Sequence, residues 1–312
     1  MVATLKEPVE KLPLALRKNL RDSFTAKKEE LEGQLSTLLG GEAWTIDVNP
    51  NLLFAYAPEG SYGYSSLGDC IKDYVEGAIY QMKYNFESRG HGEEGIAELN
   101  SLASKHVLTI YPDLEGKFSY CGVDIKDGEL RILFTEGNLG SNINYALSEL
   151  PKAINDASIA AGNNPLPYFA RHSIKEDYTG KIEELRKKIA KQLHNDDIKL
   201  EPNFEATAAA LKKDKEARDD WPTNIGGFIY SYFESVEYYM QYNKFEEDDL
   251  MYEGFAEQVP KGVIEFNIVP KLGESRSYNE IVIKDGVCAL QTQPQNFGTN
   301  INQVADKIVD IL

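Results

Sequence analysis

The sequence lacks any hydrophobic run approaching the roughly 20 residues that a membrane-spanning helix needs. Its first residues, 1–8, also contain no apolar stretch of the kind found in signal peptides. We therefore expect a cytoplasmic protein without a membrane partner.

Cysteine and histidine are scarce, with three and four residues respectively. Cys70, Cys121 and Cys288 are widely separated, so we expect three buried free thiols rather than disulfides or ligands. The histidines show no metal-ligand spacing, and no phosphate loop, dinucleotide fingerprint or nucleophile elbow is present. The sequence thus predicts no metal, no cofactor and no catalytic residue, and it favours a non-enzymatic protein without excluding an enzyme.

Positive charge is in deficit, with 33 basic against 50 acidic residues and a net charge of -17. Such a surface repels nucleic-acid phosphates and anionic lipids. The charge excludes nucleic acid as a favoured partner and points to a protein partner with a basic surface.

The sequence repeats itself at a spacing of 158 residues. YQMKYN at 80–85 matches YYMQYN at 238–243, and GSNIN at 140–144 matches GTNIN at 298–302. A chain of 312 residues is also long enough for two domains. We predict a tandem duplication, with a first copy at 1–160, a linker at 161–172, a second copy at 173–312, and the copies packed as a pseudo-twofold pair.

Each copy is predicted to be an α+β unit: a helix, a short strand, a long helix, a second helix, three antiparallel strands and a closing helix. Alternating apolar residues predict the three strands at 106–111, 118–125 and 130–135. Asp127-Gly128 and Asp285-Gly286 are hairpin turn signals. We expect Ser141 and Thr299 to cap the closing helices, an interpretation favoured over an anion site at the same motif.

The copies differ most in the stretch that follows the short strand. In the first copy we expect a strand at 52–56 and a loop at 58–66, with no helix between residues 52 and 66. In the second, the alanine-rich segment 204–218 predicts a helix.

The long helix has two shared faces when its residues are projected at 100° each. One is apolar and predicts the core stripe, formed by Ile71, Val75, Ala78 and Met82 and by Ile229, Phe233, Val236 and Met240. The other is formed by Glu76, Tyr80, Tyr84, Glu234, Tyr238 and Tyr242.

The second of these faces, with its tyrosines and glutamates, is open to two interpretations. We expect Tyr80 and Tyr238 to be buried, so that replacing either by alanine costs about 3–5 kcal/mol of stability. The alternative is that this face binds a partner protein, since tyrosine is enriched at binding hot spots.

A small-molecule ligand is a further alternative. A pocket between the antiparallel sheet and the long helix would be lined by Tyr80, Tyr84 and the loop containing Tyr62 and Tyr64. Such a pocket would suit a small-molecule-binding protein or an enzyme.

The segment from the hairpin into the closing helix resembles F-actin capping protein subunits. The residues that carry the resemblance are Lys284-Asp285-Gly286-Val287-Cys288-Ala289-Leu290-Gln291 and Asn300-Ile301-Asn302-Gln303-Val304. The resemblance implies an antiparallel sheet that ends in an Asp-Gly hairpin, a long helix after it, a pseudo-twofold pair and a cytoskeletal partner. The leading hypothesis, which rests on the duplication, the negative charge and the lack of catalytic signatures, is a non-enzymatic interaction protein that binds a protein partner.

Overall fold

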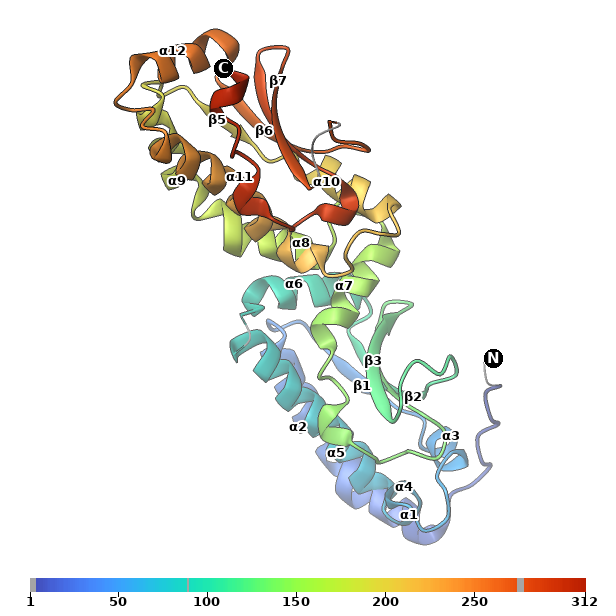
Figure 1. The fold of residues 1–312 in the computed structure, drawn as a ribbon. Helices are drawn as coiled ribbons and strands as arrows, with labels where there is room; N and C mark the ends of the chain where they lie inside the picture. The colour runs from blue at the N-terminus through green and yellow to red at the C-terminus, as the bar shows by residue number, and fades with distance from the viewer. Residues whose placement is uncertain (1–3, 89, 274–277) are drawn as a thin grey trace. The chain divides into compact units, whose positions relative to one another are not determined.

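The computed structural model describes residues 4–88, 90–273 and 278–312. The chain divides into two compact units, Met1–Gly162 and Asn163–Leu312, and each contains one four-stranded mixed sheet with helices (Figure 1). Residues 1–3 of the expected first copy lie outside the described residues. Helix α8 begins at Tyr168, inside the segment expected to be a linker.

In the first unit, residues 20–38, where the first helix of the copy is expected, form π, 3-10 and α-helical segments in succession. The elements of this unit are α1 Leu14–Asn19, η1 Leu20–Phe24, η2 Thr25–Lys27, α2 Lys28–Leu38, β1 Thr45–Asp47, α3 Pro50–Ala55, α4 Tyr62–Ser65, α5 Leu67–Lys83, η3 Tyr84–Ser88, α6 Gly92–Leu102, β2 Val107–Pro112, β3 Cys121–Lys126, β4 Glu129–Phe134, η4 Ile143–Tyr145 and α7 Leu150–Ala161.

The second unit follows a similar order. Its elements are α8 Tyr168–Ser173, η5 Ile174–Thr179, α9 Ile182–Gln192, β5 Lys199–Glu201, α10 Phe204–Lys213, α11 Trp221–Tyr242, α12 Asp249–Gln258, β6 Val263–Ile268, β7 Asn279–Lys284, β8 Val287–Thr292, η6 Pro294–Asn296, η7 Ile301–Gln303 and η8 Val309–Ile311.

Both sheets are mixed, so the expectation of three antiparallel strands is wrong. The strand orders are β1-β2-β4-β3 and β5-β6-β8-β7. In each, only the last pair is antiparallel, and β2 and β6 run parallel to β4 and β8. Alternation of apolar residues reports which side of a strand faces the core, but it carries no information on the direction of the neighbouring strand.

The two hairpins are confirmed. Lys126 pairs with Glu129 across Asp127-Gly128, and Lys284 pairs with Val287 across the equivalent turn. All four turn residues have positive φ, between 52° and 78°. This is the conformation that a tight two-residue hairpin loop requires, and aspartate and glycine adopt it at low cost.

The stretch that differs between the copies is only partly as expected. Helix α10 is present, although it ends at Lys213. The expected strand and loop at 52–66 are instead the helices α3 and α4. Pro50 starts α3, and the Asn49 side chain accepts a hydrogen bond from the Leu52 N–H (3.1 Å). This N-cap stabilises a helix and outweighs the strand preference of the residues that follow.

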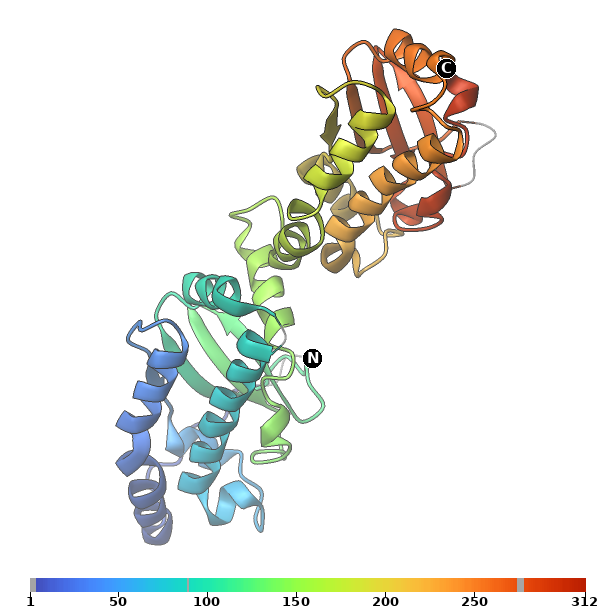
Figure 2. The same ribbon diagram turned by 90° about the vertical axis from the view of Figure 1, so that its left-hand side faces the viewer.

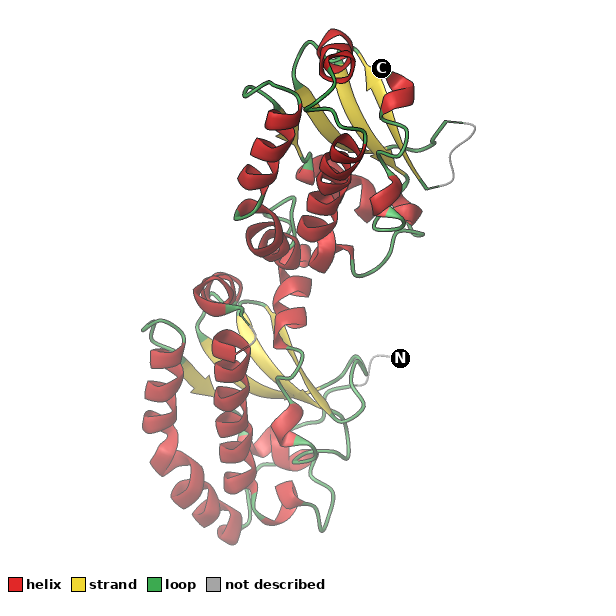
Figure 3. Cartoon of the chain, turned by 60° about the vertical axis from the view of Figure 1, so that its left-hand side comes forward, coloured by secondary structure: helices red, strands yellow, loops and turns green. Residues whose placement is uncertain are grey.

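The long helices α5 and α11 lie against one face of their sheets. In Figures 2 and 3, α5 lies beside α2, and α11 lies beside α9. The predicted apolar stripe is confirmed, because all eight of its residues are buried. In the second unit this stripe packs with Ile264 and Phe266 of β6 and Leu290 of β8 in one continuous core. The space between the sheet and helix α11 is therefore filled by side chains.

Each long helix also makes a close backbone contact through a glycine. The Asn19 side chain accepts a hydrogen bond from Gly68 N–H (2.6 Å), and the Ser173 hydroxyl accepts one from Gly226 N–H (3.1 Å). A Cβ atom at Gly68 would lie 2.5 Å from the Asn19 carbonyl oxygen, and one at Gly226 would overlap Ser173. Only glycine allows this approach without displacement of the backbone.

We predict opposite effects for two glycine-to-alanine substitutions in helices of the first unit. Gly68→Ala should lower the free energy of unfolding by about 1–3 kcal/mol, because the new methyl group collides with fixed backbone. Gly33→Ala is the matched control, since nothing lies within 4 Å of that position in α2; it should raise stability by up to ~1 kcal/mol. Chemical denaturation of the full chain measures both, and a neutral Gly68→Ala would contradict the contact.

Candidate functional site

Each long helix has one face that carries a glutamate and two tyrosines, which we call the Tyr/Glu face: Glu76, Tyr80 and Tyr84, or Glu234, Tyr238 and Tyr242. This face is exposed, so the expected burial of Tyr80 and Tyr238 is wrong. Tyr80 is 68% exposed and Tyr84 47%, while Tyr238 and Tyr242 are 56% and 72% exposed. The neighbouring helices α2 and α9 cover other flanks of α5 and α11. The helical spacing of residues separates the apolar face from the face with tyrosine and glutamate. It does not reveal whether another element of the fold covers the second of these.

The loop that follows β4 lies beside the exposed face of α5. Gly140 and Asn142 have φ values of 90° and 54°, and the Gly140 N–H donates to the Tyr74 hydroxyl (3.0 Å). Gln81 Nε2 donates to the Asn144 carbonyl (2.8 Å). These bonds attach the loop to the helix along its length.

The expected capping of a closing helix at this loop is wrong in both units. No side-chain cap is formed, and a 3-10 turn follows Asn142 and Asn300, each in the left-handed conformation. In the first unit the α-helix begins only at Leu150, and in the second the described chain continues in turns and 3-10 segments. A helix capped by Ser141 or Thr299 would need Asn142 or Asn300 in the right-handed helical conformation, and both are left-handed.

The second unit attaches its loop to its helix at equivalent positions. The Gly298 N–H lies 3.4 Å from the Tyr232 hydroxyl, which itself donates to Asn279 Oδ1 (3.1 Å). Asn279 Nδ2 donates to the carbonyl oxygens of Thr299 and Asn300 (2.8 and 3.0 Å). Tyr232 and Asn279 correspond to Tyr74 and Cys121 at the spacing of 158 residues.

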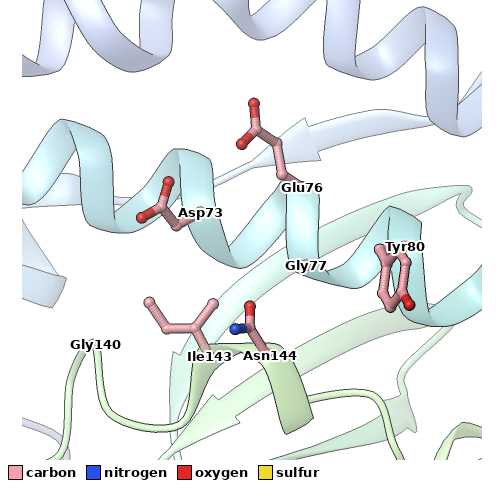
Figure 4. Close-up of a pocket in the computed structure, with 7 residues that line it drawn as sticks. All are labelled: Asp73, Glu76, Gly77, Tyr80, Gly140, Ile143 and Asn144. Atoms are coloured by element: carbon pink, nitrogen blue, oxygen red, sulfur yellow. The ribbon is translucent and has the colours of Figure 1, made fainter.

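A groove lies between helix and loop in each unit, and we call it the helix–loop groove. In the first unit it is a cavity of about 470 Å³ (Figure 4). Gly77 leaves room on its helix wall, and the Asn144 side chain points from the loop toward the helix. Glu76 stands on the side of the helix away from the loop. The groove is lined by Asp73, Glu76, Gly77, Tyr80, Gly140, Ile143 and Asn144.

The groove of the second unit is larger, at about 870 Å³. It is lined by Phe228, Ser231, Glu234, Ser235, Glu237, Tyr238, Tyr239, Gly298, Asn300, Ile301 and Asn302. This set includes the 158-residue counterpart of every residue that lines the first groove. Five of the seven counterparts are identical: the glutamate, tyrosine, glycine, isoleucine and asparagine.

The two grooves differ in their charge pairing. In the first, Lys72 lies 2.8 Å from Glu76 and 3.2 Å from Asp73. In the second, Tyr230 occupies the position of Lys72, and Glu234 forms no ion pair with any described residue. The glutamate of the first groove is thus neutralised by a neighbouring cation, whereas that of the second is not.

The other predicted tyrosines divide between groove and surroundings. Tyr62 borders one end of the first groove, where its hydroxyl donates to Asp73 (2.7 Å). Burial and that hydrogen bond raise the pKa of Tyr62. Tyr64 stacks on Phe54 at 5.3 Å and does not line the groove, and neither do Tyr84 and Tyr242. A further shared pair of exposed tyrosines, Tyr120 and Tyr278, precedes β3 and β7 outside the grooves.

The thiols are only partly as expected, because Cys121 is half-buried whereas Cys70 and Cys288 are buried. Burial raises the pKa of Cys70 and Cys288 to about 12 and that of Cys121 to about 11. All three thiols are therefore protonated at neutral pH. They are poor nucleophiles in this form, because the nucleophilic species is the thiolate. Within the described ranges no cluster of three or more potential metal-binding side chains occurs, and no helix there is long and apolar enough to cross a membrane.

Sequence reasoning missed one wall of the groove. The repeated Gly-Ser/Thr-Asn-Ile-Asn was interpreted as a helix cap, although it and the Tyr/Glu face were both shared between the copies.

Comparison with known proteins found no matching family model, no matching curated protein and no matching solved structure.

We predict that the groove tyrosines contribute little to stability. Tyr80→Ala and Tyr238→Ala should change the free energy of unfolding by less than ~1 kcal/mol, as exposed substitutions usually do. Tyr74→Ala, on the same helix as Tyr80 but fully buried, should cost about 3–5 kcal/mol. Denaturation midpoints compare the three variants, and a large loss for Tyr80→Ala would show that its ring is packed in solution.

Proposed function

We propose that this chain is a non-enzymatic protein-interaction protein that binds a basic segment of a partner protein in its helix–loop grooves. The observation that carries this proposal is the sharing of exposed groove residues by the two units. Packing accounts for four other residues that the long helices share, Gly68, Ile71, Tyr74 and Met82, because all four are buried. It does not account for the exposed Glu76 and Tyr80 and their counterparts, which binding explains.

The chemistry of the grooves and of the whole chain favours a basic partner. A glutamate beside a tyrosine ring offers a carboxylate for ion pairing and an aromatic face for a cation. The net charge of -17 attracts a basic surface over a longer range and speeds the encounter. The same charge disfavours nucleic acid and anionic membranes as partners.

We further infer that the two units are copies of one ancestral unit. The order and direction of the strands, which the two units share, support this inference. Matching residues that lie 158 positions apart in the sequence support it as well. Their packing as a pseudo-twofold pair stays a prediction. Common ancestry with F-actin capping protein subunits would make the partner cytoskeletal, which also stays a proposal.

A small-molecule ligand is a second candidate function. It is favoured by the volume of the second groove, about 870 Å³, which lies within the usual range of about 300–1,000 Å³ for ligand pockets. The site would differ from the sheet-to-helix pocket expected from sequence, because core side chains fill that space in the second unit. A ligand that competes with basic peptides for the grooves would show that one surface serves both functions.

We predict that the chain binds a labelled peptide of alternating glycine and arginine, and that added salt weakens binding. The double variant Tyr80→Ala/Tyr238→Ala should lower affinity by at least ~30-fold, or ~2 kcal/mol, the loss typical of a hot spot. Tyr145→Ala is the matched control, since Tyr145 is also 68% exposed but does not line a groove. Fluorescence anisotropy measures the affinities.

Two results would argue against this proposal. One is equal binding of a glycine–glutamate peptide, which would remove charge as the basis of recognition. The other is an equal loss from the control and the double variant, which would place the binding surface elsewhere.

A further inference from the structure

We propose that the two grooves are unequal: the groove of the second unit holds an arginine side chain of the partner, while Lys72 keeps the groove of the first unit weak. This inference rests on the proposed function, and it names the side chain recognised and the unit that recognises it. It follows from one difference between the units, because Tyr230 stands in the second unit where the first has Lys72. It follows also from the different surroundings of Glu76 and Glu234.

A cation of the chain itself, Lys72, already pairs with the carboxylates that line the first groove. Lys72 Nζ lies 2.8 Å from Glu76 and within reach of Asp73, and the hydrogen bond to Glu76 raises the pKa of Lys72. Asp73 is further engaged by the Tyr62 hydroxyl. Together these three charged residues leave one net negative charge. An incoming cation must therefore displace Lys72 from Glu76 before it gains a carboxylate.

The second groove is lined by two glutamates, and the cation at its edge, Arg218, is paired with Asp220 instead of with either of them. Glu234 has no ion pair among the described residues, and Glu237 receives only a hydrogen bond from Gln192 Nε2 (3.2 Å). Two glutamates thus line the second groove without an ion pair to any described residue. An arginine placed here gains an ion pair without breaking one.

The second groove also offers a fixed aromatic surface. Tyr238 stacks on Tyr242 with ring centroids 6.4 Å apart and an interplanar angle of 17°, and it meets the edge of Tyr239 at 5.2 Å. In the first unit the counterpart of Tyr239 is Gln81, which bonds to the loop carbonyl of Asn144. The smaller volume of the first groove agrees with this closer attachment.

A buried hydroxyl on the wall of the second groove, that of Ser235, is a second feature that distinguishes the two grooves. Ser235 is 5% exposed, and its Oγ has no hydrogen-bond partner in the described part of the chain. Its counterpart in the first groove is Gly77. Unsatisfied buried polar atoms are costly, and a ligand donor such as a guanidinium N–H would satisfy this one after a small rotation of the side chain.

Arginine is preferred to lysine because of the geometry that the groove presents. A guanidinium group stacks on an aromatic ring while its edge binds a carboxylate, whereas an ammonium group is a point charge. The chain uses this arrangement twice: Arg131 lies over Tyr111 and binds Asp124, and Arg218 lies over Phe228 and binds Asp220. Phe228 itself lines the second groove, so one arginine already stacks at its edge.

The test uses a blocked peptide with one arginine flanked by glycines, titrated into the full chain by calorimetry or NMR. Peptides with lysine or with uncharged citrulline in place of the arginine are the comparisons. Arginine should bind at least tenfold more tightly than citrulline and more tightly than lysine. Glu234→Gln should lower affinity at least tenfold, and Glu76→Gln by a clearly smaller factor, because Lys72 already occupies that carboxylate.

The decisive variant is Lys72→Met, which removes the competing cation and keeps the apolar part of the side chain. It should raise the binding stoichiometry from one arginine peptide per chain toward two. Glu253→Gln is the control for net charge, because this exposed residue lies on α12 outside the groove, and it should leave affinity unchanged.

The possible failures are distinguishable. Equal losses from Glu76→Gln and Glu234→Gln, or an unchanged stoichiometry in Lys72→Met, would overturn the inequality of the grooves and leave the proposed function standing. Equal binding of the arginine and citrulline peptides would overturn cation recognition, and with it the proposed function.

Discussion

The position of the long helix in each unit is the constraint on which the candidate site depends. At one end, Gly68 and Gly226 allow the helix backbone to touch the preceding segment. More than one turn further along each helix, the hydroxyls of the buried Tyr74 and Tyr232 accept hydrogen bonds from the loop glycines Gly140 and Gly298. A helix fixed at both points holds its exposed glutamate and tyrosine at a set separation from the loop. The groove is therefore preformed, so a ligand of the kind we propose would lose little binding free energy in ordering it.

Sequence reasoning succeeded where one local pattern determines the outcome. The apolar stripe of α5 and α11 and the Asp-Gly hairpins are of this kind, because helical period and turn chemistry act over a few residues. It failed where distant residues decide. The parallel pairing of β2 with β4 depends on the path of the chain across the sheet, and the helix α3 depends on one capping side chain, Asn49, immediately before it.

The candidate site also combines features that a local sequence pattern predicts with features that depend on distant residues. The sequence places Glu76 with Tyr80 and Glu234 with Tyr238 on one helix face, but the expected burial of the two tyrosines is wrong, because spacing along a helix does not reveal what lies opposite that face. The loop wall was present in the sequence as a repeated motif with two asparagines. Its left-handed residue turns the chain alongside the helix, and no single-sequence pattern distinguishes that turn from a helix cap.

The strand order has a consequence for association between copies of the chain. In each sheet the outermost strands leave one row of backbone groups without a strand neighbour, and such rows are templates for pairing with another molecule. One outer strand, β1 or β5, is only three residues long, and the other, β3 or β7, carries charged residues such as Asp124, Lys126, Glu280 and Lys284. Short and charged edges resist intermolecular pairing.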